Sequence, residues 1–355
     1  MLVRISVRPR WFPVECRMSK VNVAFGHRSI SQSIAGCVSV LIAVLAISGC
    51  ASSPVLTAPT GETSLNCDPG GATTAAATVP PWAELIESMP DPVAVSDGDF
   101  RAAIIGTGLA WRVRERMSGV EMLLVPPGTF LIGCSASKRF GCEDHENPRH
   151  LVTLTKPFYL GRFEVTQAQW QRVMGSNPSR LRGEGDASNR PVDSVSWDDV
   201  HGFASATGLR LPTEAEWEYA SRAGTETAFP NGSDDDASVS EIAWLNESAL
   251  GGAGRNPILP AHSVGSKAPN ALGFHDMLGN VMEWVNDRYD PWYYAHSPSE
   301  NPLGPQSDEK TGVQRVIRGG GFGHDTSRVR SSYRNAGTSE IKGDVLGFRA
   351  ARSPC

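Results

Sequence analysis

The sequence predicts a loop-rich α+β domain with short strands and three short helices, preceded by a signal segment and a linker. The 355 residues include 36 glycines and 25 prolines, which favour turns over long helices. Segments that alternate between apolar and polar residues are short, and three segments of helical apolar spacing follow them. Strands and helices do not alternate along the chain, so a doubly wound parallel sheet is not expected.

The N-terminal segment has the features of a bacterial lipoprotein signal. Residues 34–47 form an apolar run of 14 residues, which is too short to span a bilayer as a helix. Lys20 and Arg28 precede this run, and small residues followed by Cys50 come after it. We expect cleavage before Cys50, lipidation of Cys50, and attachment to a membrane of the bacterial cell envelope, facing the periplasm or the exterior. A plain signal peptide or an uncleaved anchor is the alternative.

Three segments follow from this interpretation. Residues 1–49 are the signal peptide, residues 50–99 are the lipidated cysteine and a flexible linker rich in Ala, Thr, Pro and Ser, and residues 100–355 are the domain. Loss of residues 1–49 removes six basic residues and one acidic residue, so the net charge falls from −5 to −10. An acidic mature chain argues against nucleic acid as a partner, because binding to phosphates relies on Lys and Arg.

The remaining cysteines are consistent with an oxidising compartment. Besides Cys50, the mature chain keeps Cys67, Cys134, Cys142 and Cys355, and four cysteines allow three pairings. A disulfide between Cys134 and Cys142 is expected because these residues bracket a short loop. Cys67 would then pair with Cys355, and a free or metal-binding pair is the alternative.

The first elements of the domain are expected to be strands. They cover residues 109–117, 120–125, 129–133, 150–155 and 158–165, with two more strand-like pieces at 316–317 and 345–352.

Three helices follow the first strands, each with a capping residue at its start. Thr166, Ser196 and Thr213 are the expected N-caps, and Gln or Glu three residues later completes a capping box in the first and third. The second helix is expected to stop at Gly208 and the third at Gly224.

The segment from Asp276 to residue 284 is the first candidate site. Asp276 and Glu283 supply carboxylates, and the turn at Gly279 and Asn280 can direct backbone carbonyls towards them. Calcium takes hard oxygen ligands of this kind. The alternative is a turn whose acidic side chains bond backbone N–H groups.

The third helix carries glutamates at 214, 216 and 218, which could form a catalytic carboxylate pair. On a helix, however, side chains at this spacing point mostly to different sides. Capping by Glu216 and the interaction of Glu214 with the helix dipole explain them without catalysis. A structural role is therefore favoured.

The glycine-rich stretch after residue 318 holds a lone histidine and several arginines. His324, with Asp325, could serve as a base or a metal ligand, or it could be a solvated loop residue. Arg328, Arg330 and Arg334 could bind a carboxylate or a sulfate bidentately. Ion pairs with acidic residues of the domain are the favoured interpretation.

Seven segments together carry a family resemblance. They are Met122–Gly133, Phe163–Gln167, Pro191–Trp197, Arg210–Tyr219, Gly279–Trp284, Arg318–Gly321 and Leu346–Arg349. In this order they resemble the formylglycine-generating (sulfatase-modifying) enzyme family. The resemblance implies the compact, loop-rich, mixed α/β fold of that family, which is related to C-type lectins.

The resemblance also implies a calcium site. In the family, calcium is bound at the positions of the Asp276 side chain, the Gly279 and Val281 carbonyls, and the Glu283 carboxylate. A second family calcium site would begin near Asn246, but its later acidic ligands have no clear match among residues 251–262.

The resemblance further implies two cysteines after the Gly-Gly motif. In the family they bind copper(I) and, with oxygen, oxidise a substrate cysteine to formylglycine. The matching positions here are His324 and Val329. Copper(I) needs soft thiolates, and valine has no ligand atom. Copper binding and formylglycine formation are therefore not expected.

Two functions remain, so enzymatic activity is left open. The first is a calcium-stabilised binding or scaffold module on an envelope lipoprotein, with a protein or glycan ligand. The second is a divergent oxidase of the same superfamily that performs protein cysteine oxidation or a related metal-dependent oxidation through His324. A second His, Asp or Glu beside His324 in an open pocket would favour the oxidase, whereas arginines and solvent there would favour the binding module.

Overall fold

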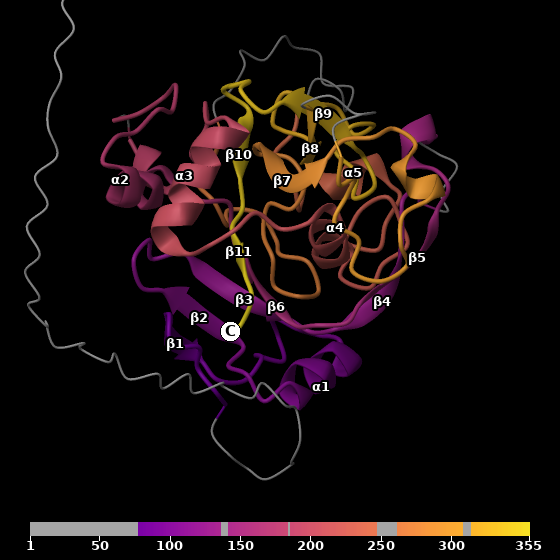
Figure 1. Ribbon diagram of the computed structural model, residues 1–355, viewed down its shortest axis with the longest axis horizontal. Helices are drawn as coiled ribbons and strands as arrows, with labels where there is room; N and C mark the ends of the chain where they lie inside the picture. Colours follow the sequence, from indigo (N-terminus) through magenta and orange to yellow (C-terminus); the bar gives the residue numbers. More distant parts are fainter. Residues whose placement is uncertain (1–76, 136–140, 184, 247–260, 308–313) are drawn as a thin grey trace, which may run out of the picture. The chain divides into compact units, whose positions relative to one another are not determined.

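The computed structural model describes residues 77–135, 141–183, 185–246, 261–307 and 314–355 (Figure 1). All of them fall in the compact unit Thr63–Cys355. The expected signal peptide, Cys50 and Cys67 lie outside the described residues. Among the described helices, none combines the length and apolar character needed to cross a membrane.

The strands of the described residues form three sheets. Their bounds are β1 Ala83–Glu87, β2 Arg112–Glu115, β3 Glu121–Val125, β4 Gly128–Ile132, β5 His150–Leu154, β6 Phe158–Gly161, β7 Met282–Arg288, β8 Gln314–Arg318, β9 Asn335–Thr338, β10 Leu346–Phe348 and β11 Ala351–Arg352. One sheet has five strands in the antiparallel order β1-β2-β3-β6-β11. A second has the order β10-β7-β8-β9, with β10 parallel to β7, and β4 pairs with β5 in a third.

The described α-helices are short and lie between the strands in sequence. They are α1 Gly98–Gly106, α2 Gln167–Met174, α3 Trp197–Thr207, α4 Glu214–Arg222 and α5 Asp236–Val239. The expected α+β fold class with short elements is thus confirmed, although α1 and α5 add to the three expected helices.

The three predicted helix starts are confirmed by their caps. The side chains of Thr166, Ser196 and Thr213 each accept a hydrogen bond from the backbone N–H three residues later, and each cap is a reciprocal capping box. Helix α3 ends at Gly208 in the left-handed conformation, as predicted. Helix α4 ends one residue before the predicted Gly224, because Ala223 itself adopts the left-handed conformation with φ of 46°.

The folded part begins earlier than the boundary that the sequence suggested at residue 100. Strand β1 pairs with β2, and Ala83 in β1 is fully buried. Helix α1 starts at residue 98, where the carboxylate of Asp97 accepts bonds from the N–H groups of Asp99 and Phe100. This cap was a local signal of a helix, but the mixed composition around it obscured the pattern.

Helix α4 and the disulfide loop carry several of the residues that the sequence singled out. Helix α4 packs against β4 and β7, and Glu216 is the one residue of α4 that is not buried. The predicted disulfide is confirmed, because Cys134 and Cys142 are bonded with a Cα–Cα distance of 5.7 Å. Cys355 is also disulfide-bonded, and its expected partner lies outside the described residues.

Candidate functional site

The glycine-rich loop after β8 folds back on itself. Gly320 has a φ of 70°, and a Cβ at this position would lie 2.7 Å from the Arg328 carbonyl oxygen and 2.9 Å from Cγ2 of Val329. A side chain at Gly320 would therefore be strained in conformation and would also clash. The glycine allows residues 328–329 to pack directly on the loop.

The backbone of this loop holds His324 in place. Its Nδ1 accepts a hydrogen bond from the Gly321 N–H at 3.0 Å, and its own N–H donates to the Gly321 carbonyl at 2.8 Å. Its carbonyl accepts from the Asn246 N–H at 2.9 Å. Burial lowers the pKa of His324, and the charge of Arg328 lowers it further against the opposing effect of Asp325. The ring is therefore neutral at pH 7, as an accepting Nδ1 requires.

The second position that matches a copper ligand is part of the core. Val329 is fully buried and belongs to the main hydrophobic cluster. Arg328 and Asp325, whose charges act on His324, are both exposed. Within the described residues, no group of three or more His, Cys, Asp or Glu side chains is arranged to hold a metal ion. The charges that act on His324 therefore come from one arginine and one aspartate at the surface.

The neighbouring arginines are ion-paired inside the domain. Arg330 binds both oxygens of Glu146 at 2.6 and 2.7 Å, and Arg334 binds both oxygens of Glu214 at 2.7 and 2.9 Å. All four side chains are at least 97% buried. The favoured structural interpretation is therefore confirmed for Arg330 and Arg334. Arg328 is exposed.

The other two glutamates of α4 also have structural roles. Glu216 binds Arg210 bidentately at 2.6 and 2.7 Å and caps the helix. Glu218 accepts bonds from the Gly133 N–H at 2.9 Å and from Nε of Arg222 at 2.8 Å, and it is also paired with Arg318. No carboxylate on α4 is left over for acid–base chemistry.

The two carboxylates of the segment expected to bind calcium differ in their hydrogen-bond partners. Asp276 is buried with a φ of 54°, and its Oδ2 accepts the Gly265 N–H at 2.6 Å. Its Oδ1 is buried and has no hydrogen-bond partner among the described residues. Glu283, in contrast, accepts bonds from Arg349 at 2.8 Å and from Nε1 of Trp217 at 2.7 Å.

A further carboxylate beside this segment was missed by the sequence interpretation. Glu164 is 1% exposed, and neither of its side-chain oxygens has a partner among the described residues. Burial raises the pKa of Glu164 well above its usual value, and the charge of Asp276 raises it further. Burial likewise raises the pKa of Asp276 to about 6. An acidic residue inside an otherwise apolar segment was the available signal.

These contacts test whether calcium suits the donor set. Asp276 and Glu164 fit a cation, because they are buried carboxylates with unpaired oxygens and the charge of Asp276 disfavours the ionised form of Glu164. Glu283 fits less well, because Arg349 and Trp217 already bind both of its oxygens. Gly279 and Val281 lie in the same turn, where Gly279 has a φ of 77°.

Asn246, the expected first residue of a second calcium site, makes a backbone hydrogen bond to the loop that holds His324. The N–H of Asn246 donates to the carbonyl of His324. Residues 247–260, in which the further ligands were sought, lie outside the described part of the chain.

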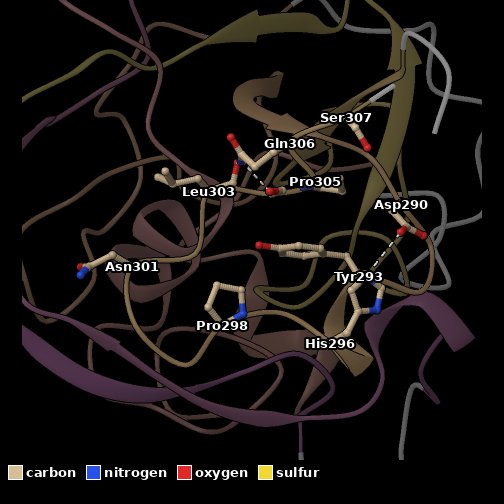
Figure 2. A pocket seen from close by; sticks show the side chains of 10 residues that line it. Asp290, Tyr293, His296, Pro298, Asn301, Leu303, Pro305, Gln306 and Ser307 are labelled. Carbon is tan, nitrogen blue, oxygen red and sulfur yellow. Dashed lines mark hydrogen bonds and ion pairs between the residues drawn. The ribbon is translucent and has the colours of Figure 1, made fainter. Parts of the chain in front are cut away.

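A separate pocket lies beside the 3-10 turn Tyr293–Ala295 (η4), with a volume of about 430 Å³ (Figure 2). Its lining residues are Asp290, Tyr293, His296, Pro298, Asn301, Leu303, Gly304, Pro305, Gln306 and Ser307.

Comparison with known proteins establishes the family. A model of the sulfatase-modifying factor enzyme 1-like domain matches residues 110–354. The chain belongs to this family. It is 37% identical over 205 residues to a formylglycine-generating enzyme of Streptomyces coelicolor, covering 53% of this chain but only 59% of that enzyme. It is 31% identical over 253 residues to chaperone protein LppX of Paenibacillus barcinonensis, covering 57% of this chain and 82% of that protein.

Solved structures agree with the family assignment. PvdO from Pseudomonas aeruginosa has a TM-score of 0.57 at 28% identity, covering 68% of this chain and 97% of PvdO. Treponema denticola variable protein 1 has a TM-score of 0.55 at 26% identity, covering 66% of this chain and 95% of that protein. The formylglycine-generating-enzyme fold, related to C-type lectins, is therefore confirmed.

Proposed function

We propose that this member of the family is a binding or scaffold module and not a formylglycine-generating oxidase. One observation carries the proposal. The positions that match the two copper-binding cysteines hold Val329, which is buried in the core, and His324, whose Nδ1 is bonded to the Gly321 N–H. A valine side chain offers no electron pair, and a single neutral imidazole does not replace a pair of thiolates for copper(I).

The direct test measures turnover. The mature chain is incubated with copper(I), oxygen, a thiol reductant and a peptide containing Cys-x-Pro-x-Arg, and oxygen consumption is followed together with conversion of the peptide thiol to an aldehyde. The relative from Streptomyces coelicolor serves as the positive control. We expect no turnover above the rate without protein, and copper-dependent formation of the aldehyde would refute the proposal.

A gain-of-ligand experiment sharpens the test. If the loop keeps the family geometry, His324→Cys and Val329→Cys together restore a pair of soft ligands. The double variant is expected to bind copper(I) at least about tenfold more tightly than either single variant, because two thiolates act on one ion. Competition with a coloured copper(I) chelator measures this, and the two single variants are the matched controls.

The divergent oxidase is the competing function, and it depends on His324. Metal analysis of the purified mature chain separates the two. A stoichiometric transition metal that is lost in His324→Ala would support the oxidase. Calcium without copper would support the binding module.

Calcium is proposed as a structural ion of this module. Its support is the pair of buried carboxylates Asp276 and Glu164, which have unpaired oxygens. When bound, the ion would neutralise these charges and accept the Gly279 and Val281 carbonyls as further ligands. Asp276 and Glu164 would then fix the turn at residues 276–281 against the segment that precedes α2.

The proposed location is the bacterial cell envelope, with a lipid anchor at Cys50. Its support is the apolar run before Cys50, together with the Cys134–Cys142 disulfide, which persists in oxidising compartments. Incorporation of a labelled fatty acid into the wild type but not into Cys50→Ala tests the anchor. Equal labelling of both proteins would contradict it.

A further inference from the structure

We propose that the pocket beside η4 binds a neutral saccharide ring. This inference rests on the proposed binding function and gives it a ligand class. The pocket is separate from the loop that holds His324, and none of its lining residues belongs to the segments that carried the family resemblance.

One wall of the pocket presents three functional side chains in a row. The Tyr293 N–H donates to the Asp290 carbonyl at 3.2 Å, and the His296 N–H donates to the Tyr293 carbonyl at 3.0 Å. Residues three apart in such a turn lie above one another. Figure 2 accordingly shows Asp290 and His296 side by side next to the Tyr293 ring.

Two of these side chains have polar atoms for a ligand. Oδ1 of Asp290 accepts the Trp292 N–H at 2.8 Å, whereas Oδ2 lies 3.8 Å from Nε2 of His296, which is within ion-pair distance but too long for a hydrogen bond. The His296 side chain is 61% exposed. A carboxylate oxygen that accepts and an imidazole that donates or accepts can together bind adjacent hydroxyl groups of one ring.

The opposite wall is held in place before any ligand arrives. Nε2 of Gln306 donates to the Gly304 carbonyl at 2.7 Å, and the amide of Asn301 bonds the N–H and hydroxyl of Thr155 at 2.9 and 2.8 Å. Pro298 and Pro305 also line the pocket and have fixed φ angles. A preformed wall lowers the entropy cost of binding a small ligand.

The composition of the lining selects the ligand class. Among the described residues that line the pocket, none is Lys or Arg, which disfavours a phosphate or sulfate relative to a neutral ligand. It contains one carboxylate, whereas calcium takes six to eight oxygen ligands. The remaining side chains are neutral polar groups and the apolar surfaces of Tyr293, Leu303 and two prolines. A neutral ring with hydroxyl edges and an apolar C–H face matches these surfaces, and about 430 Å³ accommodates a small saccharide.

The test uses three defined saccharides: maltose, cellobiose and N,N′-diacetylchitobiose. Saturation-transfer NMR and calorimetry on the mature chain are expected to detect at least one of them, with a Kd of about 1 mM, typical of a site with few anchors. Asp290→Asn and His296→Ala are each expected to weaken binding about tenfold. Glu300→Gln makes the same change in charge as Asp290→Asn at an exposed residue outside the pocket, and it should change the Kd by less than about twofold.

Several results would overturn the proposal. One is the absence of transfer from all three saccharides. Another is binding that neither Asp290→Asn nor His296→Ala changes, and a third is competition by a proline-rich peptide in place of a saccharide. Because His296 is exposed, its variant remains informative if Asp290→Asn folds poorly. The oxygen-consumption assay contains no saccharide, so the proposed non-oxidase function and this pocket can fail independently.

Discussion

Two sets of buried acidic side chains in this protein differ in how their charge is compensated. Glu146 and Glu214 are each bound bidentately by the guanidinium group of one arginine. Glu164 and Asp276 are equally buried, but three of their four carboxylate oxygens have no partner among the described residues. The same residue type thus serves as a structural element in one place and as a candidate ligand in the other.

The difference appears in the direction of the pKa shifts. Burial alone raises the pKa of Glu146 and of Glu214, but Arg330 and Arg334 more than offset it, and both values fall below normal. For Glu164, burial and the charge of Asp276 outweigh the opposing charge of Arg349, and its pKa stays well above normal. A buried carboxylate is therefore a candidate site when no arginine binds it directly, and not merely because it is buried.

Replacing an arginine that pairs with Glu146 or Glu214 should have the largest effect on the stability of the fold. Arg330→Met leaves Glu146 as an uncompensated buried charge, and we expect a loss of about 3–5 kcal/mol in the free energy of unfolding. Chemical denaturation measures this. The double variant Arg330→Met/Glu146→Gln should recover part of the loss, because the buried charge is then absent.

An exposed ion pair provides the control for this prediction. Lys342 binds Asp199 with their side chains 52% and 35% exposed. Lys342→Met should cost at most about 1 kcal/mol, because solvent screens such pairs. If Arg330→Met is no less stable than Lys342→Met, the buried pair of Arg330 and Glu146 does not stabilise the fold.

Replacing Glu164 should abolish the stabilisation of the folded state by calcium. At a calcium concentration about 100 times the Kd, the wild type is expected to gain about 2.7 kcal/mol in stability. Glu164→Gln should abolish this gain, and in the presence of a chelator it should be at least as stable as the wild type, because it removes an unpaired buried acid. Thermal melts with calcium, with magnesium and with chelator measure the effect.

The matched control is Glu300→Gln, which makes the same change at an exposed position. It should keep the full calcium response. If calcium does not stabilise the wild-type protein, the proposal that Glu164 and Asp276 bind calcium is wrong.

The sequence predicted features that depend on neighbouring residues. Thr166, Ser196 and Thr213 were identified as caps because a helix start is encoded within four residues. The Cys134–Cys142 disulfide was identified because the two cysteines are only eight positions apart in the sequence.

Features that depend on distant residues could not be predicted in the same way. Arg330 was expected to find an acidic partner, but that partner, Glu146, is 184 residues away in the sequence. Likewise, the partner of Glu283, Arg349, lies 66 residues later in the sequence. The pocket beside η4 is lined by the single stretch 290–307, but no motif in that stretch marks it.

Another buried carboxylate, Asp287, is intermediate between the two sets, because it has a hydrogen-bond donor but no arginine in direct contact. Its Oδ2 accepts the Glu214 N–H at 2.8 Å, so it has a hydrogen bond but no cation. Burial raises the pKa of Asp287 well above its usual value, and the charge of Glu214 raises it further. The folded state therefore holds a proton that the unfolded state releases near pH 4, and this contribution to stability is lost as the pH rises towards the folded pKa.

Asp287→Asn keeps the hydrogen-bond acceptor and removes the titration. The difference in unfolding free energy between this variant and the wild type should be near zero below about pH 4 and should grow in favour of the variant as the pH rises, reaching about 1 kcal/mol or more before it levels off. Denaturation of both proteins at several pH values isolates the titration of Asp287 and its neighbour Glu214, because the trends of groups that Asp287 does not contact, such as Glu146, cancel in the difference. A variant that is less stable than the wild type throughout this range would mean that Asp287 is charged and compensated, as Glu146 is.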